Sequence, residues 1–185
     1  MELLQQLTEQ AKRLPLSAFS ERFEGIYLIG RISDNQAMGF ATRVGTPSHI
    51  ELLKAIKDGQ EKIQNETLLL RVEKSDRNSW KSRISVGRAT NNDLIVRHAS
   101  VSKLHAHFLV QAENRAGLRF EQLVLADAGS ANGTLVNGRT LEEGEDRSVQ
   151  VNVGDRILFG EVECELLDAA TLHRRLRRLA VHSDF

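Results

Sequence analysis

The chain has 185 residues, enough for one domain with a sizeable core and an appendage but too few for two large domains. Hydrophobic residues make up 41% of it and charged residues 27%, which is typical of globular proteins and excludes a disordered or membrane composition. Because 25 Lys and Arg residues balance 25 Asp and Glu residues, the overall charge does not support a nucleic-acid-binding coat, and any anion site must be local.

Residues 1–65 predict a small α/β extension made of a helix, a hairpin and a second helix. Apolar residues recur at helical intervals in 2–14 and again in 49–63. Between these segments, IYLIGRI and AMGFATRV have the composition of two short strands around the turn signal SDNQ. The first residues lack the basic start and long apolar run of a secretory signal, and no later run is long enough to span a membrane, so we expect a cytoplasmic protein.

The sequence changes character from Thr67 to Leu167, where short apolar runs are separated by Gly, Asn and Asp. This spacing predicts an all-β sandwich or barrel. Asn137-Gly138 predicts a type I′ turn between two strands. The only cysteine, Cys164, excludes a disulfide framework and is expected to be a small buried residue. The predicted strand segments are TLLLRVE, SRISVG, LIV, HAHFLVQ, FEQLVLAD, TLVNGRTL, VQV, RILFG and VECELL.

Residues 169–185 predict a short basic amphipathic helix with leucines on one side and arginines largely elsewhere. We expect it to pack through its leucines and to expose its arginines to solvent. Binding of nucleic acid, of an acidic lipid surface or of an acidic groove on a partner remains an alternative. The salt dependence of binding by a chain ending near Asp168, compared with the full chain, would separate these readings.

Three predicted loops carry polar side chains suited to an anion: NND after Gly87-Arg88, then SVSKLH, then DAGSANGT. If the sandwich brings these loops to one end, they place a guanidinium, an ammonium, hydroxyls and a carboxamide together. A phosphorylated side chain carries roughly −1.5 to −2 charges and three acceptor oxygens, so it needs several donors. Arg88 offers a planar fork, Lys103 a point charge and Ser102 a hydroxyl, which favours a phosphate held beside an extended peptide.

Six short motifs follow one another in a fixed order along this region. They are GR at Gly87-Arg88, SKLH at Ser102–His105, GSANGT at Gly129–Thr134, VNG at Val136–Gly138, GD at Gly154-Asp155 and FG at Phe159-Gly160. In this order and spacing they resemble a forkhead-associated (FHA) domain over residues 66–168. Gly30-Arg31 repeats the first dipeptide but has no Ser-x-x-His downstream. The division expected is an extension at 1–65, an FHA domain at 66–168 and a C-terminal helix at 169–185.

The resemblance implies a mainly β protein with an antiparallel sandwich of about eleven strands, whose loops bind phosphothreonine peptides without enzymatic activity. By this resemblance Asn132 bonds the peptide backbone and His105 ties the loops together. Ala131 departs from the pattern, because many relatives have Thr or another polar residue there, and its missing hydroxyl weakens binding or shifts selectivity. The peptide-binding residues implied are Arg88, Ser102, Lys103, Ser130 and Asn132, and the supporting residues are Gly87, His105, Gly133 and Thr134, with the glycines permitting turns that a Cβ would strain.

No catalytic, metal or cofactor site is expected. His105 and His107, together with His98, lack further ligands at a familiar metal-binding spacing. The segment GSANG has Ala131 where a nucleophile elbow needs serine, and it lacks the Gly-Lys-Ser/Thr of a nucleotide-binding loop.

The function expected from these residues is a phosphothreonine-dependent adaptor that recruits clients of an upstream serine/threonine kinase. The alternative is a phospho-independent structural subunit of a larger assembly, with residues 1–65 or the basic helix making the essential contacts. The sequence contains no strong evidence for a nucleic-acid or membrane partner. Phosphorylation of the chain's own threonines, including Thr8, Thr42 and Thr46, would let one copy bind another, so self-association stays an alternative.

Overall fold

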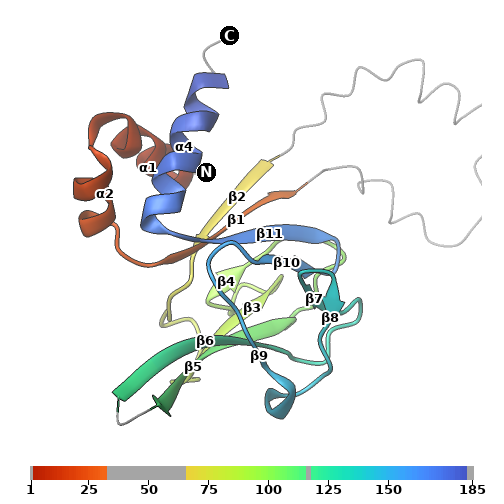
Figure 1. Cartoon of the computed structure of the whole chain (residues 1–185). Helices are drawn as coiled ribbons and strands as arrows, with labels where there is room; N and C mark the ends of the chain where they lie inside the picture. The colour runs from red at the N-terminus through yellow and green to blue at the C-terminus, as the bar shows by residue number, and fades with distance from the viewer. Residues whose placement is uncertain (1, 33–65, 116–117, 183–185) are drawn as a thin grey trace, which may run out of the picture.

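The computed structural model describes residues 2–32, 66–115 and 118–182. Within these ranges eleven strands form two sheets, so the predicted mainly β sandwich is confirmed (Figure 1). The predicted strand AMGFATRV and the predicted helix at 49–63 lie outside the described residues.

The two sheets have six and five strands. The six-stranded sheet runs in the order β2 (Glu66–Arg71), β1 (Ile26–Ile32), β11 (Val162–Asp168), β10 (Arg156–Phe159), β7 (Thr134–Val136) and β8 (Arg139–Thr140). The five-stranded sheet runs in the order β4 (Leu94–Ile95), β3 (Arg83–Gly87), β5 (Ala106–Arg115), β6 (Leu118–Asp127) and β9 (Val149–Gln150). A short 3₁₀ helix, η1 (Glu145–Arg147), precedes β9.

The main core lies between the sheets, because alternate residues of each strand point inward. Val86, Phe108, Leu125 and Phe159 are all fully buried there. Cys164 of β11 is buried in the same core, as predicted, and this burial raises the pKa of its thiol to about 12. The cysteine is therefore a packing residue rather than a nucleophile.

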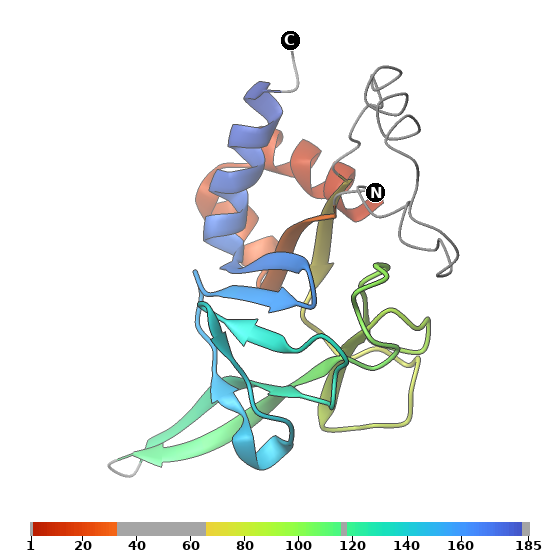
Figure 2. The same cartoon turned by 90° about the vertical axis from the view of Figure 1, so that its right-hand side faces the viewer.

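Three helices cover the outer face of β1, β2 and β11: α1 (Glu2–Arg13), α2 (Leu16–Arg22) and α4 (Ala169–His182) (Figures 1 and 2). Leu7 of α1, Phe19 of α2 and Leu172 of α4 are buried in a second apolar core against this face. The ring of His173 packs on Phe19 and its Nε2 lies 3.0 Å from the carbonyl oxygen of Leu14. The C-terminal helix thus packs through its leucines, while Arg174 and Arg177 are exposed.

The strand β1 has both faces buried and lies inside the sheet rather than in a separate extension. Leu28 faces the main core, whereas Tyr27 and Ile29 face the helices. The strand pairs with β11, with Leu28 opposite Leu166, and with β2, with Ile32 opposite Glu66. The expected boundary between residues 65 and 66 therefore separates two strands that pair with each other.

Two local features shape the sandwich: a tight turn between β7 and β8, and a parallel pairing of β3 with β4. Asn137 and Gly138 have φ angles of 51° and 80°, which confirms the type I′ turn between β7 and β8. The pairing of β3 with β4 is parallel, unlike the antiparallel pairing expected throughout. The chain after Gly87 doubles back so that Asp93 returns to Ser85, whose backbone N–H donates to the Asp93 carboxylate at 2.8 Å.

Candidate functional site

Three loops meet at one end of the sandwich: residues 88–93 after β3, residues 96–105 after β4, and residues 128–133 after β6. We call them together the three-loop surface. The backbone N–H of Arg88 donates to the carbonyl of Ser102 at 3.0 Å, which joins the first loop to the second. The backbone N–H of Ala131 donates to Ser102 Oγ at 3.0 Å, which joins the third loop to the second. The loops singled out in the sequence are therefore brought together.

Gly87 lets the first and second loops approach each other closely. A Cβ at this position would lie 2.3 Å from the Lys103 carbonyl oxygen and 2.8 Å from Asn92 Nδ2, distances that real Cβ atoms do not show. From the sequence we expected glycine here to permit a turn, but the φ angle of Gly87 is not positive. Glycine is required instead because the second loop approaches the backbone of Gly87 so closely that a Cβ would not fit. Gly133, in contrast, has a φ of +78°, which favours glycine by conformation.

His105 is fully buried and bridges the second and third loops. Its Nδ1 accepts from the backbone N–H of Ser102 at 3.0 Å, so Nε2 carries the proton and donates to the Gly133 carbonyl at 3.0 Å. Burial lowers the pKa of His105, although the Gly133 contact and the Asp127 charge act in the opposite direction. Because both ring nitrogens are engaged, His105 does not provide a metal ligand in this arrangement.

Substituting His105 with alanine is expected to lower the free energy of unfolding by about 2–3 kcal/mol, because it leaves the Ser102 N–H and the Gly133 carbonyl without their buried partner. Phosphopeptide affinity should fall as well, because both loops lose their common anchor. Urea unfolding and peptide titration of the same variant measure the two effects. A variant that unfolds like the unmodified protein would show that His105 is not a scaffold residue.

Asp127 organises the third loop and was not identified from the sequence. Its Oδ1 accepts from the backbone N–H groups of Gly129 and Ser130, and its Oδ2 accepts from the hydroxyls of Ser130 and Thr134. Burial alone would raise the pKa of Asp127, but the Ser130 and Thr134 hydrogen bonds lower it overall. The Ser130 hydroxyl proton is directed to Asp127 at 2.6 Å, so towards a ligand this hydroxyl offers its acceptor lone pairs. An aspartate just before a Gly-Ser turn was the available sequence signal.

Four other expected site residues present polar groups at the surface. Arg88 and Lys103 are exposed, and neither has an ion-pair partner in the described part of the chain. Ser102 Oγ accepts from Ala131, so its own proton can be donated outward. Asn132 is exposed and donates one N–H to the Ser100 carbonyl at 2.8 Å, which fixes its amide across the second loop.

A second carboxylate, Asp93, holds the first loop in place, and this role was not predicted from the sequence. Its side chain is fully buried, and its Oδ1 lies 2.7 Å from the ammonium of Lys74. Further hydrogen bonds come from the N–H and hydroxyl of Ser75, from those of Ser85, and from the Asn78 amide. Burial alone would raise the pKa of Asp93, but the hydrogen bonds, the Lys74 one foremost, place it well below the usual range.

These pKa shifts predict a stepwise loss of stability in acid. Burial lowers the pKa of both His105 and His107 from 6.5, so below about pH 6.5 the unfolded chain binds protons that the folded chain does not. Stability should therefore be full above pH 6.5 and decline below it. The lowered pKa values of Asp93 and Asp127 predict a further decline below about pH 4. Thermal melts between pH 8 and pH 3 measure both steps, and a melting temperature unchanged from pH 7.5 to pH 5 would contradict the first.

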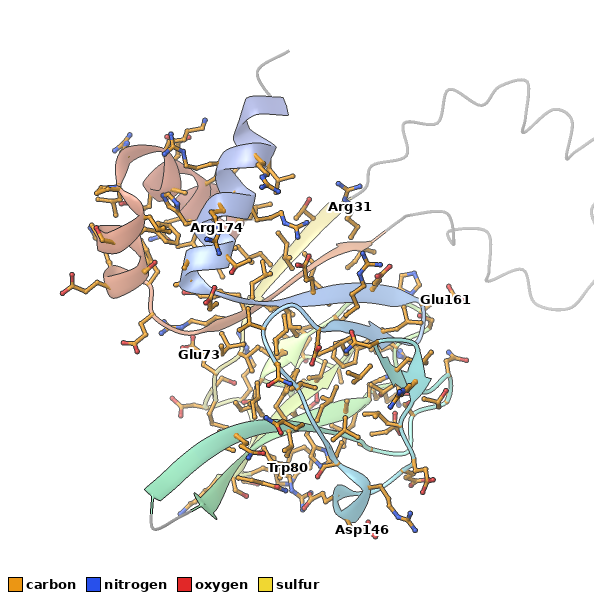
Figure 3. All side chains as sticks on the ribbon, in the orientation of Figure 1. Arg31, Glu73, Trp80, Asp146, Glu161 and Arg174 are labelled. Carbon is orange, nitrogen blue, oxygen red and sulfur yellow. The ribbon has the colours of Figure 1, made fainter. Side chains whose placement is uncertain are left out.

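A hollow with a volume of about 540 Å³ lies elsewhere, on the outer face of the six-stranded sheet beside α4. Two of its arginines already have carboxylate partners. Arg156 pairs with Glu163 at 3.6 Å, and Arg175 pairs with Glu165. Figure 3 shows Arg31 and Glu161, which also line this hollow, towards the side where β1 and β11 project beyond the helices. Its balanced charges make it less suited to a phosphate than the three-loop surface.

Two further findings concern the described residues only. No group of three or more His, Cys, Asp and Glu side chains in residues 2–32, 66–115 and 118–182 has the geometry to hold a metal ion. Among the helices of these same ranges, none combines the length and the apolar character needed to cross a membrane.

One family model and several solved structures are similar to parts of this chain. The family model of the FHA domain matches residues 84–160, which include all three loops. Similar solved structures include Mycobacterium tuberculosis EmbR in complex with a low-affinity phosphopeptide (17% identity, 78% of this chain and 24% of that chain, TM-score 0.42). Another is the FHA domain of CT664 from Chlamydia trachomatis (15% identity, 78% of this chain and 98% of that chain, TM-score 0.45). A third is the FHA domain of yeast Dun1 in complex with a doubly phosphorylated peptide (16% identity, 80% of this chain and 77% of that chain, TM-score 0.46). This chain thus spans about a quarter of EmbR, and no curated protein matches it.

Proposed function

Residues 84–160 form an FHA domain, and we propose that the protein is an adaptor that binds phosphothreonine peptides at the three-loop surface. It recruits protein partners after a serine/threonine kinase has phosphorylated them, and it acts as a binding module rather than as an enzyme. The observation that carries the proposal is that two exposed cations, Arg88 and Lys103, lie on segments that meet at Ser102: the backbone N–H of Arg88 donates to the Ser102 carbonyl, and Lys103 follows Ser102 in the chain.

The donors match the chemistry of a phosphate. The guanidinium of Arg88, the ammonium of Lys103 and the hydroxyl of Ser102 are three kinds of donor for three phosphate oxygens. The backbone hydrogen bond between Arg88 and Ser102 keeps these donors on adjoining segments. Each charge-assisted hydrogen bond contributes about 1.5–3 kcal/mol, so the unphosphorylated peptide should lose most of its affinity.

The third loop supports the backbone of the peptide. Asn132 is fixed by its hydrogen bond to Ser100, and its amide oxygen is left to accept from a peptide N–H. Ala131 adds no hydroxyl beside Ser102, so the phosphate depends on the first two loops. The preference for phosphothreonine over phosphoserine is inferred from membership of the FHA family, and we include it in this proposal.

The test is fluorescence anisotropy with three degenerate peptide pools that carry phosphothreonine, phosphoserine or unmodified threonine at a fixed position. We expect binding of the phosphothreonine pool, weaker binding of the phosphoserine pool and none of the unmodified pool. Equal binding of all three pools, or no binding at all, would instead favour a phospho-independent structural subunit.

A further inference from the structure

The three-loop surface presents three exposed cations, and only two of them were expected from the sequence. Two other exposed arginines of the sandwich have acidic partners: Arg83 pairs with Glu145 at 2.6 Å, and Arg147 pairs with Glu142 at 2.9 Å. Arg88, Arg97 and Lys103 have no ion-pair or hydrogen-bond partner for their side chains in the described ranges. Unpaired cations gathered on two adjoining loops indicate an anionic ligand.

Arg97 occupies a fixed and exposed place on the second loop. It is the middle residue of a three-residue turn that is closed by the His98 N–H donating to the Val96 carbonyl at 3.0 Å. The Val96 N–H in turn donates to the carbonyl of Gly87 at 3.0 Å, directly before Arg88. The turn therefore holds Arg97 next to the end of β3, where the first loop begins.

The acidic residues around Arg97 do not neutralise it. Between residues 87 and 105 the only acid is Asp93, whose carboxylate is buried and bonded to Lys74. On the neighbouring segments, Glu143 lies against Gly129, and the backbone N–H of Glu161 donates to Ser100 Oγ; within residues 2–32, 66–115 and 118–182 no ion pair joins Arg97 to an acidic side chain. The guanidinium keeps its full charge for a ligand.

The charge of the three cations can be compared with the charge of a bound phosphothreonine. A phosphothreonine carries roughly −1.5 to −2 charges near neutral pH, which balances the charges of Arg88 and Lys103 and leaves that of Arg97. We propose that Arg97 binds a second anionic group of the same ligand, so that the preferred ligand is a phosphothreonine peptide with another negative charge close to the phosphate. This inference rests on the proposed function and makes Arg97 a specificity-determining residue.

The experiment compares phosphothreonine peptides in which single flanking positions carry Glu, Gln or a second phosphothreonine. Affinities are measured for the unmodified protein, for Arg97→Gln, and for the matched control Arg177→Gln, which removes the same charge from the exposed face of α4. For at least one position we expect the Glu peptide to bind about two- to fivefold more tightly than the Gln peptide. This advantage should disappear in Arg97→Gln, persist in Arg177→Gln and shrink as salt is raised.

The peptide sets distinguish an acidic residue from a second phosphate as the source of the second charge. They also distinguish failure of this inference from failure of the proposed function. An advantage for the second phosphothreonine alone would support a doubly phosphorylated ligand, and an advantage for Glu would support an acidic flank. Equal binding of the Glu, Gln and doubly phosphorylated peptides at every position would overturn the inference and leave phosphothreonine binding intact. An advantage that survives in Arg97→Gln would exclude Arg97 as its cause. If no phosphothreonine peptide binds, both the inference and the proposed function fail.

Discussion

Arg88→Ala is expected to lower phosphothreonine-peptide affinity at least about a hundredfold and to leave the fold intact. The guanidinium can form two charge-assisted hydrogen bonds to a phosphate, and each contributes about 1.5–3 kcal/mol. Its side chain is exposed and has no described partner, so its loss should change the free energy of unfolding by less than about 0.5 kcal/mol. Anisotropy titration and urea unfolding of the same preparation measure the two quantities.

Arg31→Ala is the matched control for this substitution. Gly30-Arg31 repeats the dipeptide Gly87-Arg88, and Arg31 is likewise exposed, but it lies on β1 at the opposite sheet (Figure 3). The control should bind the phosphopeptide like the unmodified protein. Equal losses in the two variants would mean that general electrostatic attraction, rather than a site at Arg88, accounts for binding.

Asp93→Asn is expected to cause the largest loss of stability, about 3 kcal/mol. The substitution keeps the size of the side chain but removes the charge opposite Lys74, and it places an NH₂ group among hydrogen-bond donors. Phosphopeptide affinity should also decline, because Asp93 holds the first loop against β3. Chemical unfolding followed by circular dichroism gives the stability change.

Asp76→Asn provides the matched control, because Asp76 is exposed on the segment between β2 and β3, which also carries Lys74, the ion-pair partner of Asp93. The same change of charge there should alter the unfolding free energy by less than about 0.5 kcal/mol. If Asp93→Asn were no more destabilising than Asp76→Asn, the buried network around Asp93 would not be a stabilising feature of the first loop.

Local signals in the sequence predicted the architecture well. Strand periodicity and the Asn137-Gly138 pair are short-range features. They were sufficient to predict the sandwich, the type I′ turn and the order of the loops. The spacing of the FHA motifs placed Arg88 and Ser102 on loops that do meet. The seven-residue helix α2 was missed because one buried residue, Phe19, is too little for a periodic pattern.

Long-range pairing could not be predicted in the same way. The strand β1 was assigned to a separate extension, yet it pairs with β11, whose Leu166 lies far along the sequence from Leu28. Its nearly continuous apolar run was the signal of burial on both faces. The partnership of Lys74 with Asp93 likewise depends on tertiary structure, because a lysine and an aspartate 19 residues apart do not reveal that they meet.

In the proposed function, a phosphothreonine peptide binds at the three-loop surface. Its position can be mapped by the chemical shifts of backbone amides during titration with a phosphothreonine peptide. We expect the largest shifts at residues 88–93, 100–105 and 129–133, including the Ser102 N–H that donates to His105. Shifts confined to α1, α2 and α4, or identical shifts with the unphosphorylated peptide, would contradict it.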